Sequence, residues 1–400
     1  MTDPAIAEII LSTSRTHGLV AIASGEGFNR AQDALREAGF SPLPGGAFAA
    51  PPEQATSATA SALVHSAHEH RASITMSTRP YLGDIGSDIA ARLPGDWSAT
   101  VKTYPRRHWQ EDLIGSLWDS GDLLKAVLHD HVPCAVELSN HAGTELLLIE
   151  RPGHATGYLV GAFATEDYDD NWEEPNAPRS IVLPAKADLA ARSVAHTFLP
   201  NYRRALHHRR LDTVMSAMNR IRPEHETLQT IKASHRPGDG TPHAGSRLHA
   251  QMERAFADHA WLSFRDVLQH APLLLARCRP TASPWPQDAG ALSRLRDALA
   301  DSQDAWDEFN ALRAELYSIP ADLTAQEWSQ VRSTLGTAVL PAIRTWLADN
   351  ETFERQARAA VPGGHIPLRT QPAAAHHHTS RHAARRRKRT SDTLERDPSV

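Results

Sequence analysis

The spacing of apolar residues changes near Pro184, and this change constrains the fold more than any other feature of the sequence. Before Pro184, short apolar runs alternate with turn-forming residues, as strands and short helices require. After it, apolar residues recur every three or four positions over long stretches, which is typical of bundle helices. We therefore predict an α+β protein, with an N-terminal mixed α/β region followed by an all-α helical bundle.

Residues 17–79 are predicted to form a β-α-β-α-β unit. The apolar run Leu19–Ala23 predicts a strand, and Gly25-Glu26-Gly27 predicts the turn into a helix. Gly39 stands where a glycine would end that helix. A short strand centred on Phe48, an Ala-rich helix to about Arg71 and a strand over 73–78 complete the unit.

Residues 98–163 are predicted to form a β-α-β-β-β unit. The strand over 99–104 is followed by a single amphipathic helix over 109–129, because apolar residues repeat every three or four positions there. Three strands, 134–138, 145–150 and 157–163, then form a meander, since turn formers separate them.

The remainder is predicted to be helical up to about residue 360. Thr324 and Glu327 match a capping box, and Pro341 falls inside the helix that follows. Past Pro362 the composition favours disorder. The predicted boundaries are 1–95 and 96–183 for the two α/β units, 184–232 for helices, 233–247 for a linker, 248–360 for the helical region and 361–400 for a disordered basic tail.

The charge of the chain is strongly asymmetric. Residues 369–400 hold eight Lys/Arg and three Asp/Glu, a net charge of +5, whereas the whole chain has a net charge of −5. Such a basic segment can bind nucleic acid without reading its sequence, because it displaces counterions from phosphates. With no aromatic residue interleaved, base stacking is not expected. The residues predicted to contact nucleic acid are Arg381, Arg385, Arg386, Arg387, Lys388 and Arg389. The alternative is a solvated tail that only keeps the chain soluble, or that folds back on the acidic residues near 167–174.

A second basic cluster lies on a predicted helix. It could follow a phosphate backbone, or it could be the solvent-facing side of an amphipathic helix, and we favour the second interpretation. Its members are Arg203, Arg204, His207, His208, Arg209 and Arg210.

Several other patterns resemble known motifs but do not match them, so we predict no metal and no cofactor. The group His65, His68, Glu69 and His70 differs from the His-Glu-x-x-His zinc pattern. Gly25-Glu26-Gly27 has no third glycine for a dinucleotide fingerprint, and the acidic residues in 166–174 lack the glycine of a calcium loop. His376–His378 could bind metal adventitiously only.

Composition points to a cytoplasmic protein. Two cysteines, Cys134 and Cys278, are too few for a disulfide framework, and both lie in apolar settings where thiols are usually inert. The N-terminus lacks the features of a secretory signal, and the apolar runs are too short to span a membrane.

We therefore expect a non-enzymatic interaction protein that contacts a protein partner through its helices and holds DNA or RNA loosely through its basic tail. One alternative is an enzyme whose dispersed active site lies in the α/β region around His65, Glu69 and His108. Another is a helical module for assembly, with self-association through residues 185–360.

Overall fold

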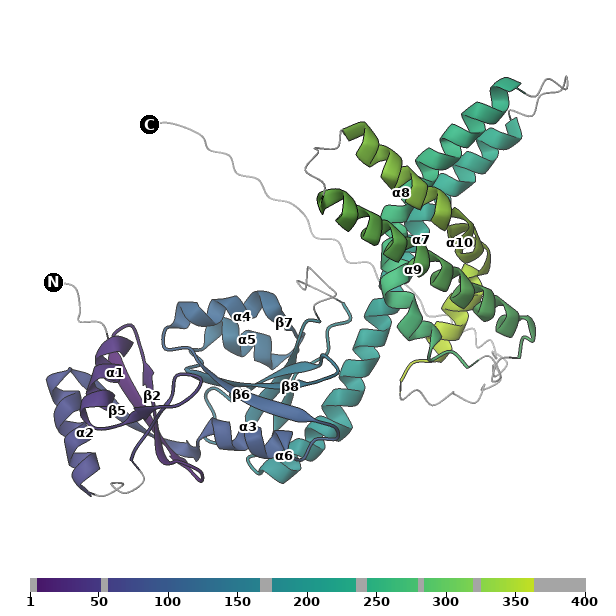
Figure 1. The fold of residues 1–400 in the computed structure, drawn as a ribbon. Helices are drawn as coiled ribbons and strands as arrows, with labels where there is room; N and C mark the ends of the chain where they lie inside the picture. Colours follow the sequence, from purple (N-terminus) through teal and green to yellow (C-terminus); the bar gives the residue numbers. More distant parts are fainter. Residues whose placement is uncertain are drawn as a thin grey trace, which may run out of the picture. The chain divides into compact units, whose positions relative to one another are not determined.

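The computed structural model describes residues 6–51, 57–165, 175–234, 243–279, 284–318 and 325–362. In these ranges, two β-sheets with their helices come first and four long helices follow (Figure 1). The predicted α+β class, with a mixed α/β region before a helical region, is therefore confirmed.

The first sheet has five strands in the order β3-β4-β2-β1-β5. Strands β1 and β5 are parallel, and the other neighbours are antiparallel. The five elements predicted for this unit are all present, and β1 and β3 are added to them. The elements are β1 (Ala7–Ser14), β2 (Gly18–Ser24), α1 (Phe28–Glu37), β3 (Ser41–Pro42), β4 (Phe48–Ala49), α2 (Ser57–Glu69) and β5 (Ala72–Pro80).

Helices α1 and α2 cover one face of this sheet. Ile9 and Leu11 of β1 are buried against Leu35 of α1 and Leu63 of α2. Gly39 has φ +84°, a left-handed conformation that glycine adopts without steric cost, which confirms the predicted end of α1.

The second sheet has the order β11-β10-β9-β8-β6, and β7 pairs with β10. Strands β8, β9 and β10 form the predicted antiparallel meander. The elements are α3 (Leu82–Ala90), β6 (Trp97–Thr103), η1 (Arg107–Gln110), α4 (Glu111–Ser116), β7 (Leu117–Trp118), α5 (Asp122–His129), β8 (Cys134–Asn140), β9 (Glu145–Glu150), β10 (Tyr158–Phe163), β11 (Ile181–Leu183), α6 (Ala187–Ser193) and η2 (Val194–Phe198).

Both faces of the second sheet are buried, which explains why β9 is a continuous apolar run. Leu146 and Leu148 belong to the core that includes α3 and α6. Leu147 and Ile149 point the other way, into a core formed with α4 and α5. Figure 1 shows α4 and α5 on one side of this sheet and α3 and α6 on the other.

The single helix predicted over 109–129 is wrong. The chain forms η1, α4 and α5, and the two-residue strand β7 interrupts them. Leu117 and Trp118 are extended because they pair with Phe163 and Ala162 of β10. A long-range strand pairing thus overrides the helical spacing of the apolar residues.

The four long helices share one core. Helix α7 contributes to two cores, because Tyr202 packs with the second sheet whereas Val214 and Met218 pack with the other long helices. Within the described residues, no helix has the length and apolarity needed to cross a membrane. The helices are α7 (Leu199–Ser234), α8 (His243–Leu275), α9 (Gln287–Ser318) and α10 (Ala325–Ala359).

The predicted linker over 233–247 begins and ends inside helices. Helix α7 continues to Ser234 and α8 begins at His243, while residues 235–242 lie outside the described ranges. The capping residue Thr324 also lies outside them, and Pro341 lies inside α10 as expected.

Candidate functional site

The residues predicted to bind nucleic acid cannot be placed in the fold. Arg381, Arg385–Arg387, Lys388 and Arg389 lie outside the described residues, as do His376–His378. Their contact with nucleic acid stays a prediction.

The second basic cluster does not form a single surface. Arg209 is buried, with its guanidinium 5.1 Å from the centre of the Trp118 ring, so it packs against the second sheet. Arg204 donates to Asn201 Oδ1 at 3.3 Å, within the same helix. The solvent-facing interpretation of the whole cluster is therefore wrong for Arg209 and for His207, because both are buried.

Three members of that cluster share another face of α7. Arg203, His207 and Arg210 are spaced by four and three positions, which places them in one row along a helix. Arg277, just beyond the end of α8, joins this row: the positive charges of Arg210 and Arg203 interact with its guanidinium. We call Arg203, His207, His208, Arg210 and Arg277 the α7–α8 cationic cluster.

The cationic cluster has no carboxylate partner among the described residues. Neither Arg203, Arg210 nor Arg277 forms an ion pair there, whereas many other arginines of the described ranges do. The Nε atom of Arg210 is buried without a hydrogen-bond partner in the described part of the chain. Burial lowers the pKa of Arg277, and the charges of Arg210 and Arg203 lower it further. Such an uncompensated group of cations is electrostatically suited to an anion.

His207 lies at the centre of the cationic cluster and is fully buried. Its Nε2 lies 2.8 Å from the carbonyl oxygen of Ala357, in the last turn of α10. Burial lowers the pKa of His207, and the charges of Arg277, His208 and Arg210 lower it further, although the hydrogen bond to Ala357 opposes this. The imidazole therefore favours its neutral form, and the permanent charge of the cluster comes from its arginines.

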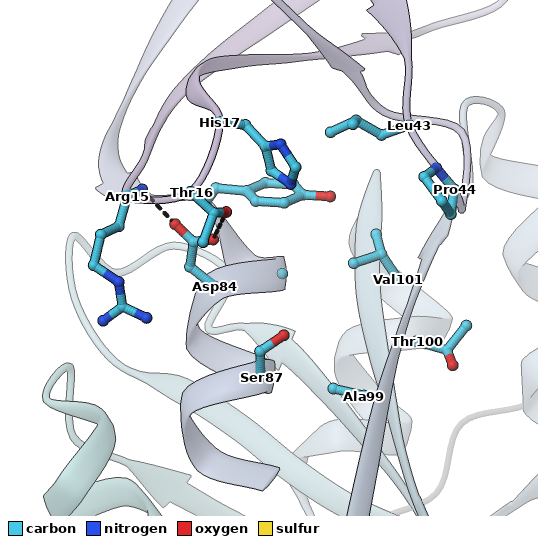
Figure 2. A pocket seen from close by; sticks show the side chains of 12 residues that line it. Arg15, Thr16, His17, Leu43, Pro44, Asp84, Ser87, Ala99, Thr100 and Val101 are labelled. Atoms are coloured by element: carbon cyan, nitrogen blue, oxygen red, sulfur yellow. Dashed lines mark hydrogen bonds between the residues drawn. The ribbon is translucent and has the colours of Figure 1, made fainter. Parts of the chain in front are cut away.

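A cavity of about 430 Å³ lies where the first sheet meets α3 and β6. Figure 2 shows Thr16 and His17 from the β1–β2 turn, Leu43 from the β3–β4 connection, Ser87 from α3 and Thr100 from β6 around it. Pockets between structural units are common ligand sites. For this cavity to be catalytic, its lining must also offer a group that can transfer a proton.

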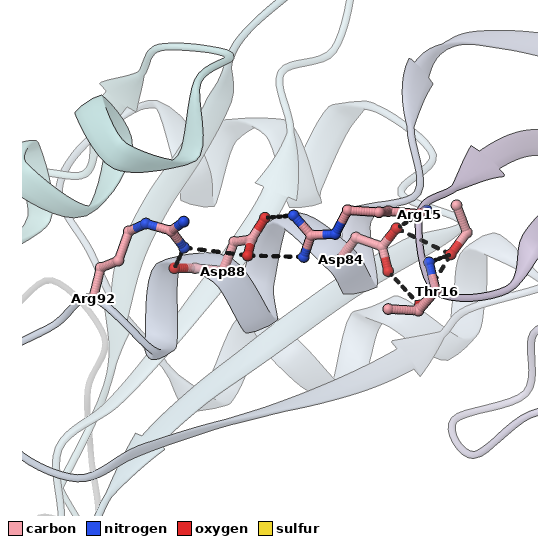
Figure 3. A network of polar contacts seen from close by, with 6 residues as sticks. Arg15, Thr16, Asp84, Asp88 and Arg92 are labelled. Atoms are coloured by element: carbon pink, nitrogen blue, oxygen red, sulfur yellow. Dashed lines mark hydrogen bonds and ion pairs between the residues drawn. The ribbon is translucent and has the colours of Figure 1, made fainter.

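The buried carboxylate at this cavity is fully engaged. Asp84, only 8 % exposed, accepts hydrogen bonds from Ser14 Oγ at 3.0 Å, from the backbone N–H of Arg15 at 2.6 Å and from Thr16 Oγ1 at 2.8 Å. Figure 3 shows how these contacts and the Arg15–Asp88–Arg92 ion pairs fasten the β1–β2 turn to α3. Asp84 therefore serves to hold the turn, since both of its oxygens already accept hydrogen bonds from it.

Of the residues predicted for a dispersed active site, His65 and Glu69 contact each other, and no contact among the described residues links either of them to His108. His65 and Glu69 form an ion pair of 3.3 Å on α2, with side chains 76 % and 57 % exposed, and His108 packs edge-on against Trp109. No group of three or more metal-ligating side chains occurs among the described residues. The acidic residues of 166–174 lie outside the described ranges.

The Gly25–Gly27 turn leads from β2 into α1, as predicted. Its backbone N–H groups are already used, since Gly25 donates to the carbonyl of Pro105 and Gly27 to that of Ile6, both at 2.8 Å. A phosphate would find neither of these donors free. Cys134 is buried, which raises the pKa of its thiol to about 12 and keeps it unreactive.

Sequence reasoning missed Arg277 as a member of the cationic cluster. It is a single arginine next to Cys278, far from Arg203 in the chain, and only the packing of α8 on α7 brings it there.

Comparisons with protein-family models, with curated proteins and with solved structures gave no match to this chain.

Proposed function

We propose that this protein is a non-enzymatic interaction protein that contacts nucleic acid without reading its sequence, through the α7–α8 cationic cluster together with the basic tail. The observation that carries the proposal is the convergence of Arg203, Arg210 and Arg277 without a carboxylate partner in the described ranges. Each guanidinium is a planar donor suited to bidentate phosphate contacts.

Chain connectivity supports combining the two basic segments. Ala357, which contacts His207, lies five residues before Pro362, the last residue described. Arg385–Arg389 follow on the same chain, so binding by the cluster would make contact by the tail an intramolecular step. Two weak contacts joined in this way would give a stronger overall affinity.

The enzymatic alternative has less support. The described cavity beside Asp84 offers hydroxyl groups and His17, but its carboxylate is used to hold the β1–β2 turn. The helical-assembly alternative rests on no described contact between copies and stays a prediction.

The test is fluorescence anisotropy of a labelled duplex DNA of arbitrary sequence, titrated with the full chain across a salt series. Each phosphate contact contributes about −0.9 to the slope of log K against log salt. The triple variant Arg203→Gln, Arg210→Gln, Arg277→Gln should therefore lose up to about 2.7 of that slope. A separate variant with Arg385–Arg389 changed to glutamine measures the tail.

A matched control removes the same charge elsewhere. Arg36, Lys125 and Arg192 each form exposed helical ion pairs, so their replacement by glutamine changes the net charge equally. The control should keep nearly the wild-type slope. Equal slopes for the cluster variant and the control would reject the cluster, and a wild-type chain that fails to bind at low salt would reject the proposal. Single-stranded RNA in the same assay shows which polyanion is preferred.

A further inference from the structure

In the described residues, the two sheets end in β3, β5, β6 and β11, and the two-residue strand β7 is a further edge beside β10. All of these except β5 are protected against pairing with another chain. Strand β3 has two residues and includes Pro42, and β11 has three residues. Strand β6 carries Lys102 and is approached by the β3–β4 connection, where a Cβ on Gly45 would overlap the carbonyl oxygen of Val101. Natural edge strands avoid pairing with another chain by short length, by proline, by charged side chains or by a loop that covers them.

Strand β5 has none of these devices over most of its length. It has nine residues, it pairs with β1 alone in the described structure, and residues 72–78 carry no charge. Ile74 is 36 % exposed and Met76 is 59 % exposed. Its register with β1 is uninterrupted from Ala72 to Met76, so this part of the edge is regular. A long, neutral, partly apolar edge is a template for strand addition.

We infer that β5 pairs antiparallel with β5 of a second copy of this chain, about a two-fold axis at Thr75. The segment Ser73-Ile74-Thr75-Met76-Ser77 is chemically symmetric about its centre. In this register each Ile74 lies opposite Met76 of the other copy, and each Ser73 lies opposite Ser77.

In this pairing, side chains of the same kind meet on each face of the two β5 strands. Side chains alternate along a strand, so Ile74 and Met76 share the face on which their partners Ile9 and Leu11 are buried. The apolar pairs therefore extend the existing core of the first sheet. The hydroxyl side chains meet on the opposite face, where cross-strand hydroxyl pairs are stabilising.

The symmetry of the segment favours a second copy over an unrelated peptide. An interface around a two-fold axis must be complementary to itself, which this neutral, alternating segment is. No charges meet within residues 72–78, because this segment contains none, and the arginines Arg71 and Arg79 come opposite each other only at the two ends of the pairing.

Disulfide trapping of the full chain tests the register. Thr75→Cys would face its own copy across the axis, at a Cα separation of about 4.5–5.5 Å that a disulfide can span. Ser73→Cys is the matched control, since its two thiol-bearing positions would lie about 13 Å apart along the strands. Both substitutions lose one side-chain hydrogen bond, to Glu8 and to the Ala7 carbonyl respectively. The native Cys134 and Cys278 are buried and should not compete.

Mild oxidation should give a covalent dimer with Thr75→Cys and far less with Ser73→Cys. In light scattering over a concentration series, Met76→Lys should lower the dimer fraction, because two ammonium groups would enter the interface. Leu262→Lys makes a comparable change at a residue 58 % exposed on α8 and should leave association unchanged. Equal trapping of both cysteine variants, a monomeric wild type, or a dimer unaffected by Met76→Lys would each overturn the inference.

Discussion

Removing the Asp84 carboxylate should destabilise the α/β region far more than removing Asp88, one turn along the same helix. Asp84 accepts three hydrogen bonds from the β1–β2 turn and is nearly inaccessible to solvent. Asp88 forms a bidentate pair with Arg15, whose side chain is 66 % exposed.

The magnitudes follow from burial. Hydrogen bonds to a charged group contribute about 1.5–3 kcal/mol each, but water in the adjacent cavity can replace part of this. We therefore expect Asp84→Ala to cost about 2–4 kcal/mol. Asp88→Ala should cost less than about 1 kcal/mol, because solvent screens an exposed pair. Asp84→Asn keeps the shape and one acceptor, so it should fall between them.

Urea unfolding followed by circular dichroism measures the difference as a shift of the transition midpoint at constant slope. Equal midpoint shifts for Asp84→Ala and Asp88→Ala would refute the reasoning, since it depends on the burial of Asp84 and on the exposure of Arg15, the partner of Asp88.

Two further outcomes are expected. Gly45→Ala should destabilise the protein more than Gly143→Ala, as thermal melting of the two variants can show. Both residues have positive φ, a conformation that costs an alanine about 1 kcal/mol. Only at Gly45 would the new methyl group also overlap the Val101 carbonyl oxygen. His207 has a lowered pKa in the folded protein, so stability should fall as pH drops below its ordinary value of 6.5, because the unfolded state then binds more protons. His207→Gln should lose this part of the pH dependence in urea midpoints, and an unchanged pH dependence would contradict the burial argument.

Helix α3 shows why some elements could not be predicted. Gly83 and Gly86 each lower helix propensity by about 1 kcal/mol relative to alanine, so the segment gives a weak helical signal. The glycines are needed for close packing: a Cβ on Gly83 would lie 2.5 Å from the Tyr81 ring, and one on Gly86 2.5 Å from Val136 Cγ1. The packing that stabilises α3 therefore requires two glycines, and these same glycines weaken the helical signal in the sequence.

Strand β1 is absent from the sequence-based prediction for a different reason. Its run Ile9-Ile10-Leu11 lies in the N-terminal segment that a secretory signal would occupy, although three successive apolar residues also suit a buried strand. The pairing of β1 with both β2 and β5 then places it inside the sheet.

The sequence by itself determined the α+β class, the meander and the helical character of the region after Pro184, because hydrophobic periodicity depends on residues two to four positions apart. Only the tertiary structure decided that Arg209 is buried, that Arg277 joins Arg203 and Arg210, and that β5 is an edge. Those outcomes depend on which helices and strands pack together, and such packing links segments far apart in the chain. Local spacing carries no information about that choice.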